Sequence, residues 1–215
     1  MLQIYKEMET DERIVKKAHE LYMRFGIRSV SMDEIAGHLG ISKKTIYQFY
    51  KDKDALVEGV LDIEMRRMEI DCTCSRIEGN NAVHEIFLAM DIVEEMFKGF
   101  NPAILYDLEK YHPKAYTKFT DHHNTYLYDC NKANIERGIM EGLYRPEINI
   151  DIMCKYRIGT MLMIFNANFF PHGKYPLATL CSEITDNFLH GLATPKGKEW
   201  ITKYKMERSK VLLTT

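Results

Sequence analysis

Residues 31–53 read SMDEIAGHLGISKKTIYQFYKDK, which is the most informative stretch of the chain. Ser31 followed by Glu34 is the pattern of a capping box, which begins a helix. Gly40 suits a tight turn, because glycine adopts a positive φ without steric cost. Ser42 then stands where the N-cap of a second short helix is expected. The stretch therefore predicts two short helices joined by a tight turn.

The spacing of Ala36, Gly40 and Ile46 is typical of a helix-turn-helix motif. Alanine lets the two helices approach closely, glycine permits the turn, and isoleucine fills the small core between the helices. In this motif the second helix lies in the major groove of DNA and presents its first side chains to base edges. A solvated helical hairpin with surface lysines would share the spacing, so the window alone leaves both interpretations open.

The second helix of the motif carries side chains suited to DNA. Lysine can bind guanine acceptors, and glutamine can bind adenine with two hydrogen bonds. Tyrosines and further lysines can contact phosphates, which position a protein without reading sequence. Lys53 begins the next helix, where its charge adds to the helix N-terminus that faces a phosphate. The residues that we expect at DNA are Ser31, Ser42, Lys43, Lys44, Thr45, Tyr47, Gln48, Tyr50, Lys51 and Lys53.

The rest of the chain has helical periodicity and no convincing alternating strand pattern, so the fold class is all-α. Before the motif, Ile14, Ala18 and Leu21 share one face of a helix that ends at Gly26. Further helices are expected over 52–77, 113–143, 150–169, 177–193 and 198–212. An apolar stripe over 83–97 indicates another helix, and Pro102 and Pro113 stand at expected helix starts.

The composition limits the class of protein. The 215 residues are 46% hydrophobic and 28% charged, which is typical of a folded domain. Because 29 Lys and Arg nearly balance 31 Asp and Glu, any surface for nucleic acid must be a local patch. The apolar run 158–165 is too short to span a bilayer, and the start of the chain lacks a signal-peptide core. We expect a cytoplasmic protein with no membrane partner.

The sequence contains no motif of a catalytic or metal site. It lacks Gly-x-x-x-x-Gly-Lys, His-Glu-x-x-His and Gly-x-Ser-x-Gly, so an enzyme is not expected. The five cysteines are Cys72, Cys74, Cys130, Cys154 and Cys181. They include no Cys-x-x-Cys pair, and the adjacent His122 and His123 diverge on a helix, so we expect no metal and no cofactor. Cys72 and Cys74 also diverge, which leaves a redox switch possible but unsupported.

Four segments together resemble a known family. They are Phe25-Gly26, Ser31-Met-Asp-Glu-Ile-Ala36, Leu39-Gly-Ile-Ser42 and Thr45-Ile-Tyr-Gln-Phe-Tyr-Lys-Asp-Lys-Asp-Ala-Leu56. The N-terminal quarter that carries them resembles the TetR/AcrR family of one-component bacterial regulators. Three positions depart from the family pattern. Phe49 stands where histidine is most frequent, Tyr50 where phenylalanine is usual, and Met32 where threonine is frequent.

The resemblance implies a division of the chain into two domains. Residues 1–53 would form a three-helix DNA-binding head, and residues 54–215 a larger helical domain for ligand sensing and dimerisation. The helices at about 150–169 and 177–193 would build the homodimer. Their apolar stripes are either internal core or a surplus that a second subunit covers. These stripes are Ile158, Met161, Leu162, Phe165, Leu177, Leu180, Ile184, Phe188 and Leu192.

The central helices are rich in methionine and aromatic residues with polar groups between them. This is the usual composition of a ligand pocket, although a stripe of methionine and aromatic residues is more often simply core. Candidates for binding an unknown small-molecule effector are Phe97, Tyr106, Phe119, His123, Tyr126, Cys130 and Phe165.

Taken with the resemblance, the sequence predicts a dimeric, sequence-specific transcriptional regulator. Its partner would be double-stranded DNA with a pseudo-palindromic operator, since a two-fold dimer presents two recognition helices. We expect a repressor that a ligand releases. The alternative is a helical ligand-binding or protein-interaction module whose DNA-binding head is inactive.

Overall fold

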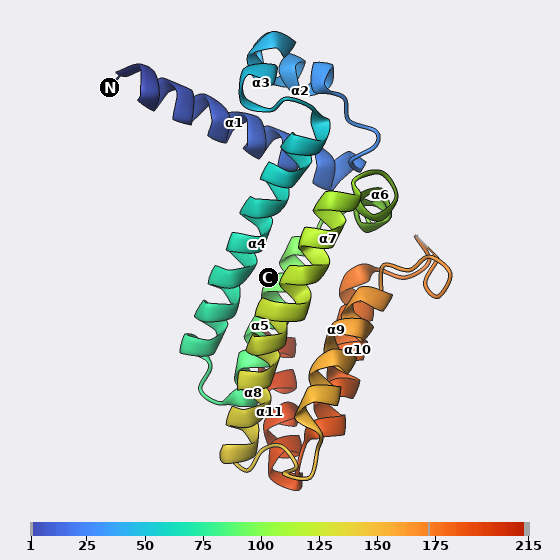
Figure 1. Ribbon diagram of the computed structural model, residues 1–215. Coiled ribbons are helices and arrows are strands. Elements are labelled where there is room, and N and C mark those ends of the chain that lie inside the picture. The colour runs from blue at the N-terminus through green and yellow to red at the C-terminus, as the bar shows by residue number, and fades with distance from the viewer. Residues whose placement is uncertain (1, 172, 213–215) are drawn as a thin grey trace. The chain divides into compact units, whose positions relative to one another are not determined.

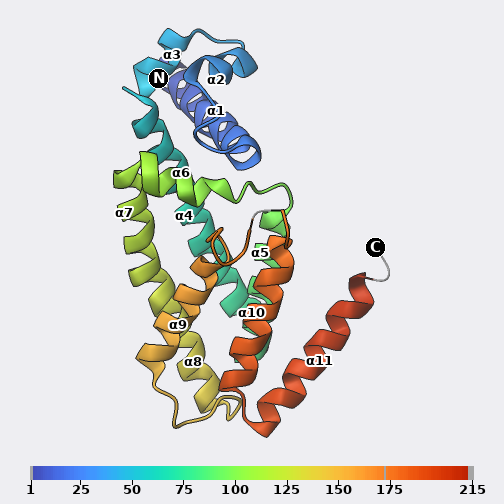
Figure 2. The ribbon, with the colours of Figure 1, turned by 90° about the vertical axis from the view of Figure 1, so that its right-hand side faces the viewer.

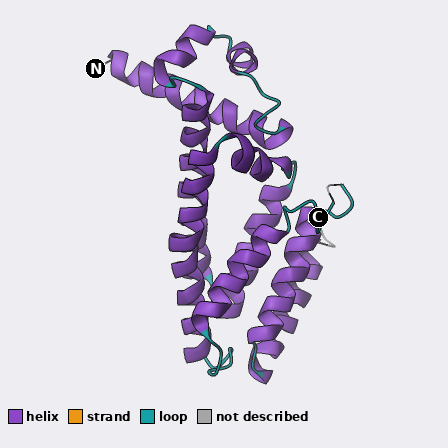
Figure 3. Ribbon diagram, turned by 45° about the vertical axis from the view of Figure 1, so that its right-hand side comes forward, coloured by secondary structure: helices purple, strands orange, loops and turns teal. Residues whose placement is uncertain are grey.

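Every regular element of the described chain is a helix. The computed structural model describes residues 2–171 and 173–212 (Figures 1 and 3). Its helices are α1 (Leu2–Phe25), α2 (Met32–Leu39), α3 (Lys43–Phe49), α4 (Lys53–Glu78), α5 (Ala82–Phe97), α6 (Ala103–Tyr111), α7 (Pro113–His122), the π-helical turn η1 (His123–Leu127), α8 (Tyr128–Met140), α9 (Ile150–Met163), α10 (Leu177–Leu192) and α11 (Pro195–Leu212). The predicted all-α class is confirmed.

The chain forms two compact units. Unit 1 contains Met1–Arg67 and Gly99–Asp121, and unit 2 contains Met68–Lys98 and His122–Thr215. The long helix α4 contributes residues to both units. The sequence predicts a boundary at residue 53 between a DNA-binding domain and a ligand-sensing domain. This functional division differs from the division into compact units and stays a prediction.

Unit 1 is built around one hydrophobic core that joins α1–α3, the first part of α4, α6 and α7. The predicted face of α1 is buried in it, with Ile14 and Ala18 fully covered. Gly26 ends α1 with a φ of +83°. After this turn, the Arg28 N–H donates a hydrogen bond of 2.9 Å to the carboxylate of the buried Asp107 of α6. We call α1, α2 and α3 the head.

Unit 2 has its main core between α5, α8, α9, α10 and α11. Helix α10 packs against α5, α9 and α11 (Figure 2). The buried Tyr144 donates its hydroxyl hydrogen bond to the Ala82 carbonyl oxygen at 3.2 Å. Its ring fits against Gly138, where any added Cβ would lie 2.0 Å from a ring carbon. A smaller cluster is formed by Ile164, Leu180 and Cys181.

The structure corrects three predicted helices. The expected continuous helix over 113–143 is interrupted by the π-helical turn η1. Helix α9 ends at Met163 rather than near residue 169, because Asn166 closes a local turn in which its Oδ1 accepts the Asn168 N–H at 2.9 Å. Helix α11 begins at Pro195, earlier than residue 198, since proline is well suited to the first helical position.

Within residues 2–171 and 173–212, no helix combines the length and the apolar character needed to span a bilayer.

Candidate nucleic-acid interface

Local hydrogen bonds build the two short helices of the head as the sequence predicts. The Ser31 hydroxyl accepts the Glu34 N–H at 3.2 Å, and the Glu34 carboxylate accepts the Ser31 N–H at 2.6 Å. Gly40 ends α2 with a φ of 66°. Ser42 caps α3 by accepting the Thr45 N–H at 3.1 Å. The capping box, the glycine turn and the second cap are therefore confirmed.

The packing between α2 and α3 leaves one side of α3 exposed to solvent. Ile46 is fully buried, and Ala36 is buried opposite it on α2. Met32 is also buried, so this departure from the family pattern contributes to the core. Phe49 is partly buried and packs against the same core. The Phe49 side chain therefore serves packing at a position where the resemblance would place a DNA contact.

The solvent side of α3 presents polar groups at helical spacing. Lys44 and Gln48 lie one turn apart, and both are exposed. Tyr47 is exposed, as is the N-cap Ser42. Thr45 is half-buried and its hydroxyl lies 2.9 Å from the Ser42 hydroxyl. The first turn of α3 and its exposed face can therefore meet base edges in a major groove without any rearrangement of the core.

Three of the expected DNA residues make contacts inside unit 1. Lys43 Nζ lies 2.7 Å from an Asp33 carboxylate oxygen. The Tyr50 hydroxyl donates to Asp11 Oδ1 at 2.6 Å, and burial and this carboxylate raise the pKa of Tyr50. Lys53 Nζ donates to a backbone carbonyl oxygen, that of residue 27, at 2.6 Å, and burial lowers the pKa of Lys53.

The two remaining expected DNA residues are exposed. They are Ser31, before α2, and Lys51, in the segment before α4. Sequence reasoning missed Asp11 and Asp33, which hold Tyr50 and Lys43. Asp33 stands ten residues before its partner and Asp11 thirty-nine before its own, so no short-range pattern could have signalled either contact.

The expected effector residues fall into three groups. Phe97 and Phe165 meet edge to face in unit 2, with ring centroids 5.8 Å apart. His123, Tyr126 and Cys130 lie along η1 and the start of α8 in the same unit.

The third group lies in unit 1. Phe119 packs there against the core. The Tyr106 ring is 51% exposed and contacts the Tyr111 ring. The residues of this group and those of unit 2 belong to separate compact units.

The predicted dimer helices bury four of the nine stripe residues within the chain and leave the other five partly buried. Ile158, Leu180, Phe188 and Leu192 are buried in unit 2, so the expected surplus does not lie at these four positions. The exposed apolar side chains of α9 are instead Ile152 and Tyr156, which are 59% and 47% exposed.

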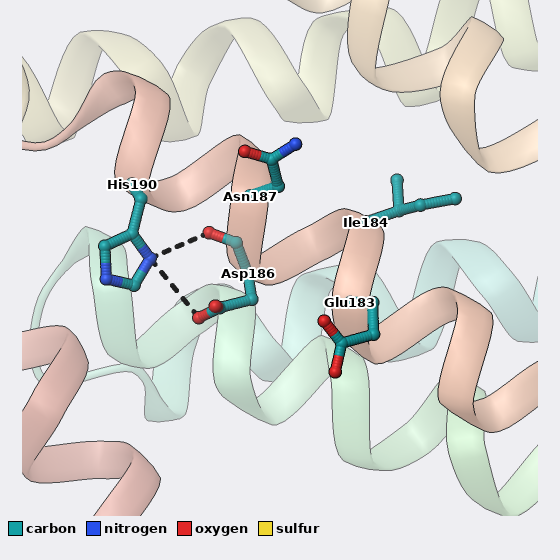
Figure 4. A pocket seen from close by; sticks show the side chains of 5 residues that line it. All are labelled: Glu183, Ile184, Asp186, Asn187 and His190. Atoms are coloured by element: carbon teal, nitrogen blue, oxygen red, sulfur yellow. Dashed lines mark hydrogen bonds and ion pairs between the residues drawn. The ribbon is translucent and has the colours of Figure 1, made fainter.

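Helix α10 carries an open hollow of about 480 Å³. Its lining is Glu183, Ile184, Asp186, Asn187 and His190 (Figure 4). His190 turns back toward Asp186, and its Nδ1 lies 2.9 Å from the Asp186 carbonyl oxygen. None of the expected effector residues lines this hollow.

A family model described as bacterial regulatory proteins of the tetR family matches residues 14–60. The matched segment contains the helix-turn-helix and the first turns of α4. Its helix-turn-helix is that of the tetR family. The chain is therefore a helix-turn-helix DNA-binding transcriptional regulator and not an enzyme.

Relatives of this regulator match it over most of its length. An uncharacterized HTH-type regulator of Bacillus subtilis, YvaF, is 24% identical over 85% of this chain and 95% of its own. A TetR-family regulator from Agrobacterium tumefaciens has a TM-score of 0.73, with 18% identity, over 87% of this chain and 100% of that one. FadR of Bacillus subtilis, solved with stearoyl-CoA, has a TM-score of 0.63, with 15% identity, over 84% and 98%. These structures share the fold of this regulator.

Proposed function

We propose that this regulator is a cytoplasmic homodimeric repressor that binds a pseudo-palindromic operator and is released by a small molecule. The observation that carries the proposal is the exposed face of α3, where Lys44 and Gln48 stand on a helix that is capped at its start and anchored by the buried Ile46. Lysine and glutamine are side chains that read guanine and adenine in the major groove. Lys51 and Tyr47 would contact phosphates beside them.

Helices α9 and α10 would form the dimer. Two observations support this dimer. The Ile152 and Tyr156 side chains are exposed. A Cβ added at Gly159 or Gly191 would have no atom of the chain outside its own helix within 4 Å. Small residues let a partner helix approach closely, and exposed apolar side chains gain from being covered. A two-fold dimer would then present two α3 helices to two half-sites.

The effector would bind among the helices of unit 2. Its aromatic pair Phe97 and Phe165, together with the polar Tyr126 and Cys130, offers the mixture of groups found in small-molecule sites. A relative of the same fold, FadR of Bacillus subtilis, was solved with stearoyl-CoA, so the fold accommodates an organic ligand in that protein. Ligand and DNA would each favour a different conformation of the dimer and so oppose one another.

The alternative function, a module whose head does not bind DNA, is favoured by one observation. Lys43, Tyr50 and Lys53 are each held by a partner within unit 1. If these contacts persist at DNA, the head has fewer groups for phosphates and weaker non-specific affinity.

Selection from random duplex DNA with the purified protein separates the two functions. The proposal expects enrichment of an inverted repeat and an affinity for it that falls steeply with salt. A Lys44→Ala variant should lose preference at one base position, whereas Lys198→Ala, at an exposed position of α11, should change nothing. Absence of any enriched sequence would favour the inactive-head alternative. A single, non-repeated site would contradict the dimer.

A further inference from the structure

One arginine of unit 2 is held against the buried face of α10. Arg157 of α9 donates from Nη1 to the Thr185 hydroxyl oxygen at 2.8 Å. Its guanidinium lies over the Phe188 ring, 5.1 Å from the ring centroid. Both Thr185 and Phe188 are buried side chains of α10, whereas Arg157 itself is half-buried. A positive charge therefore stands between α9 and α10 at the edge of the core.

No carboxylate compensates this charge. Among the residues that the structure describes, no ion pair includes Arg157, and Thr185 is its one hydrogen-bond partner. The acidic groups that are paired on the same two helices have lysines as partners. Asp151 of α9 lies 3.0 Å from Lys155 Nζ, and Asp186 of α10 lies 2.8 Å from Lys205 Nζ. The guanidinium therefore has no anion of its own.

The guanidinium has free capacity for an anion. Burial lowers the pKa of Arg157 to about 10, so the side chain stays charged at neutral pH although its surroundings disfavour the charge. Removing a charge from water costs free energy unless an opposite charge or hydrogen bonds compensate it. A guanidinium has five N–H donors, of which Thr185 accepts one. A carboxylate can accept two of the others at once.

A partly covered apolar cluster lies next to this arginine. The Thr185 hydroxyl, which accepts from Arg157, donates to the Met161 sulfur at 3.9 Å. Met161 packs against the smaller cluster of unit 2, as do the rings of Phe97 and Phe165. All three of these apolar side chains are only partly buried. They offer apolar surface that a ligand can cover, with a gain in free energy that grows with the area removed from water.

We propose that the effector of this regulator is an organic monocarboxylate, whose carboxylate pairs with Arg157 and whose apolar chain covers Met161, Phe97 and Phe165. The inference rests on the proposed function, because it names the chemical class of the effector. Small-molecule sites usually combine an apolar lining with a few polar groups that fix the orientation of the ligand. Here the planar guanidinium would orient the carboxylate by two parallel hydrogen bonds, and the apolar chain would supply the buried area.

The first test measures binding to the full-length protein and needs no DNA. The melting temperature of the purified protein is followed with the sodium salts of straight-chain monocarboxylates from acetate to decanoate. Each is compared with the alcohol of the same chain length and with sodium chloride at the same concentration. A ligand that binds only the folded state raises the melting temperature.

At least one carboxylate of this series should bind at least about tenfold more tightly than its alcohol, because a hydrogen-bonded ion pair replaces a neutral contact. Isothermal titration calorimetry of that carboxylate and its alcohol gives the two affinities. A series in which no carboxylate exceeds both its alcohol and sodium chloride would overturn the proposal. This comparison uses wild type alone, so the proposal stays falsifiable even if a variant fails to fold.

Three variants assign the anion contact to one residue. Arg157→Met removes the charge and keeps an apolar stem, so it should weaken the carboxylate by at least about tenfold and leave the alcohol unchanged. Arg157→Lys keeps the charge without the planar donor pair and should lie between wild type and Arg157→Met. Lys132→Met removes an exposed lysine of α8 and should bind as wild type. Unchanged carboxylate affinity in Arg157→Met, or equal weakening in Lys132→Met, would overturn the proposal.

The same variants separate a small molecule from a second copy of the chain as the source of the carboxylate. Sedimentation of wild type and Arg157→Met without ligand gives the dissociation constant of the dimer. We expect the same constant for both proteins. A dimer that Arg157→Met weakens, in a protein that binds no carboxylate of the series, would overturn the proposal in favour of an ion pair between subunits.

A last measurement addresses the link to DNA. Affinity for the selected operator is measured with and without the carboxylate that binds most tightly. Operator affinity of wild type should fall by at least about fivefold, and that of Arg157→Met should not change. A carboxylate that binds without changing operator affinity would overturn its role as the effector. Absence of operator binding by the ligand-free protein would instead count against the proposed function, while carboxylate binding has its own readout.

Discussion

The head and unit 2 are stabilised by contacts of different range. In the head, Ser31 pairs with Glu34 and Ser42 with Thr45, each three residues along the chain. In unit 2, the Asn81 side chain donates to the Tyr204 hydroxyl at 2.9 Å across 123 residues. Arg137 reaches Glu85 at 3.1 Å across 52 residues. Local caps define the two short helices of the head, whereas unit 2 depends on the meeting of distant segments.

The largest expected effect is on the core of the head. Ile46→Ala should lower the free energy of unfolding by about 2–5 kcal/mol, because a fully buried side chain leaves a cavity. Urea denaturation measures the loss. Ile77→Ala removes an exposed isoleucine of α4 as the matched control and should cost less than about 0.5 kcal/mol. Equal losses in the two variants would contradict the anchoring of α3 by Ile46.

The next effect concerns a long-range contact of unit 2. Tyr204→Phe removes the hydroxyl that accepts the buried Asn81 amide, which should cost about 1–3 kcal/mol. Tyr175→Phe, at an exposed ring, is the control in the same urea titration. If both variants unfold at the same urea concentration as wild type, the contact contributes nothing, and the contrast between the two regions weakens.

A smaller loss is expected at the first cap of the head. Ser31→Ala should destabilise by about 1 kcal/mol, since the Glu34 N–H loses its acceptor. Thermal denaturation measures this loss. Because the cap precedes α2, operator affinity should fall in parallel with stability. A Ser31→Ala variant with full stability would show that α2 begins without help from its cap.

The smallest effect depends on pH. Hydrogen bonds from Ser31 lower the pKa of Glu34 from its ordinary value of 4.5. A carboxyl whose pKa is lowered by folding stabilises the folded state above the unfolded-state pKa, and this contribution is lost as pH falls through the folded-state pKa. Wild type should therefore exceed Glu34→Gln in stability at pH 7, with the difference vanishing in acid. Glu12→Gln, at an exposed residue of α1, is the control. A difference that persists unchanged in acid would refute the role of the charge.

The range of the contacts explains how far the sequence could predict the molecule. Serine caps and a turn glycine act within a few residues, so Ser31, Gly40 and Ser42 were readable from their spacing. The helical spacing of the apolar residues of α10 could be predicted from the sequence. Their burial against α5 and α9 depends on the tertiary structure.

The DNA-contact set shows the same limit, because Asp33 and Asp11 hold two of its members through contacts that spacing does not encode. The interruption of the expected helix by η1 had no sequence signal that we recognised.

The central claim is that α3 reads base sequence, and the ratio of specific to non-specific affinity tests it most directly. The measurement compares the selected operator with a scrambled duplex at physiological salt, for wild type and for Lys44→Ala. The account predicts a wild-type ratio of at least about 10³, which the variant lowers through one base position in each half-site. A wild-type ratio near one, unchanged by Lys44→Ala, would contradict it.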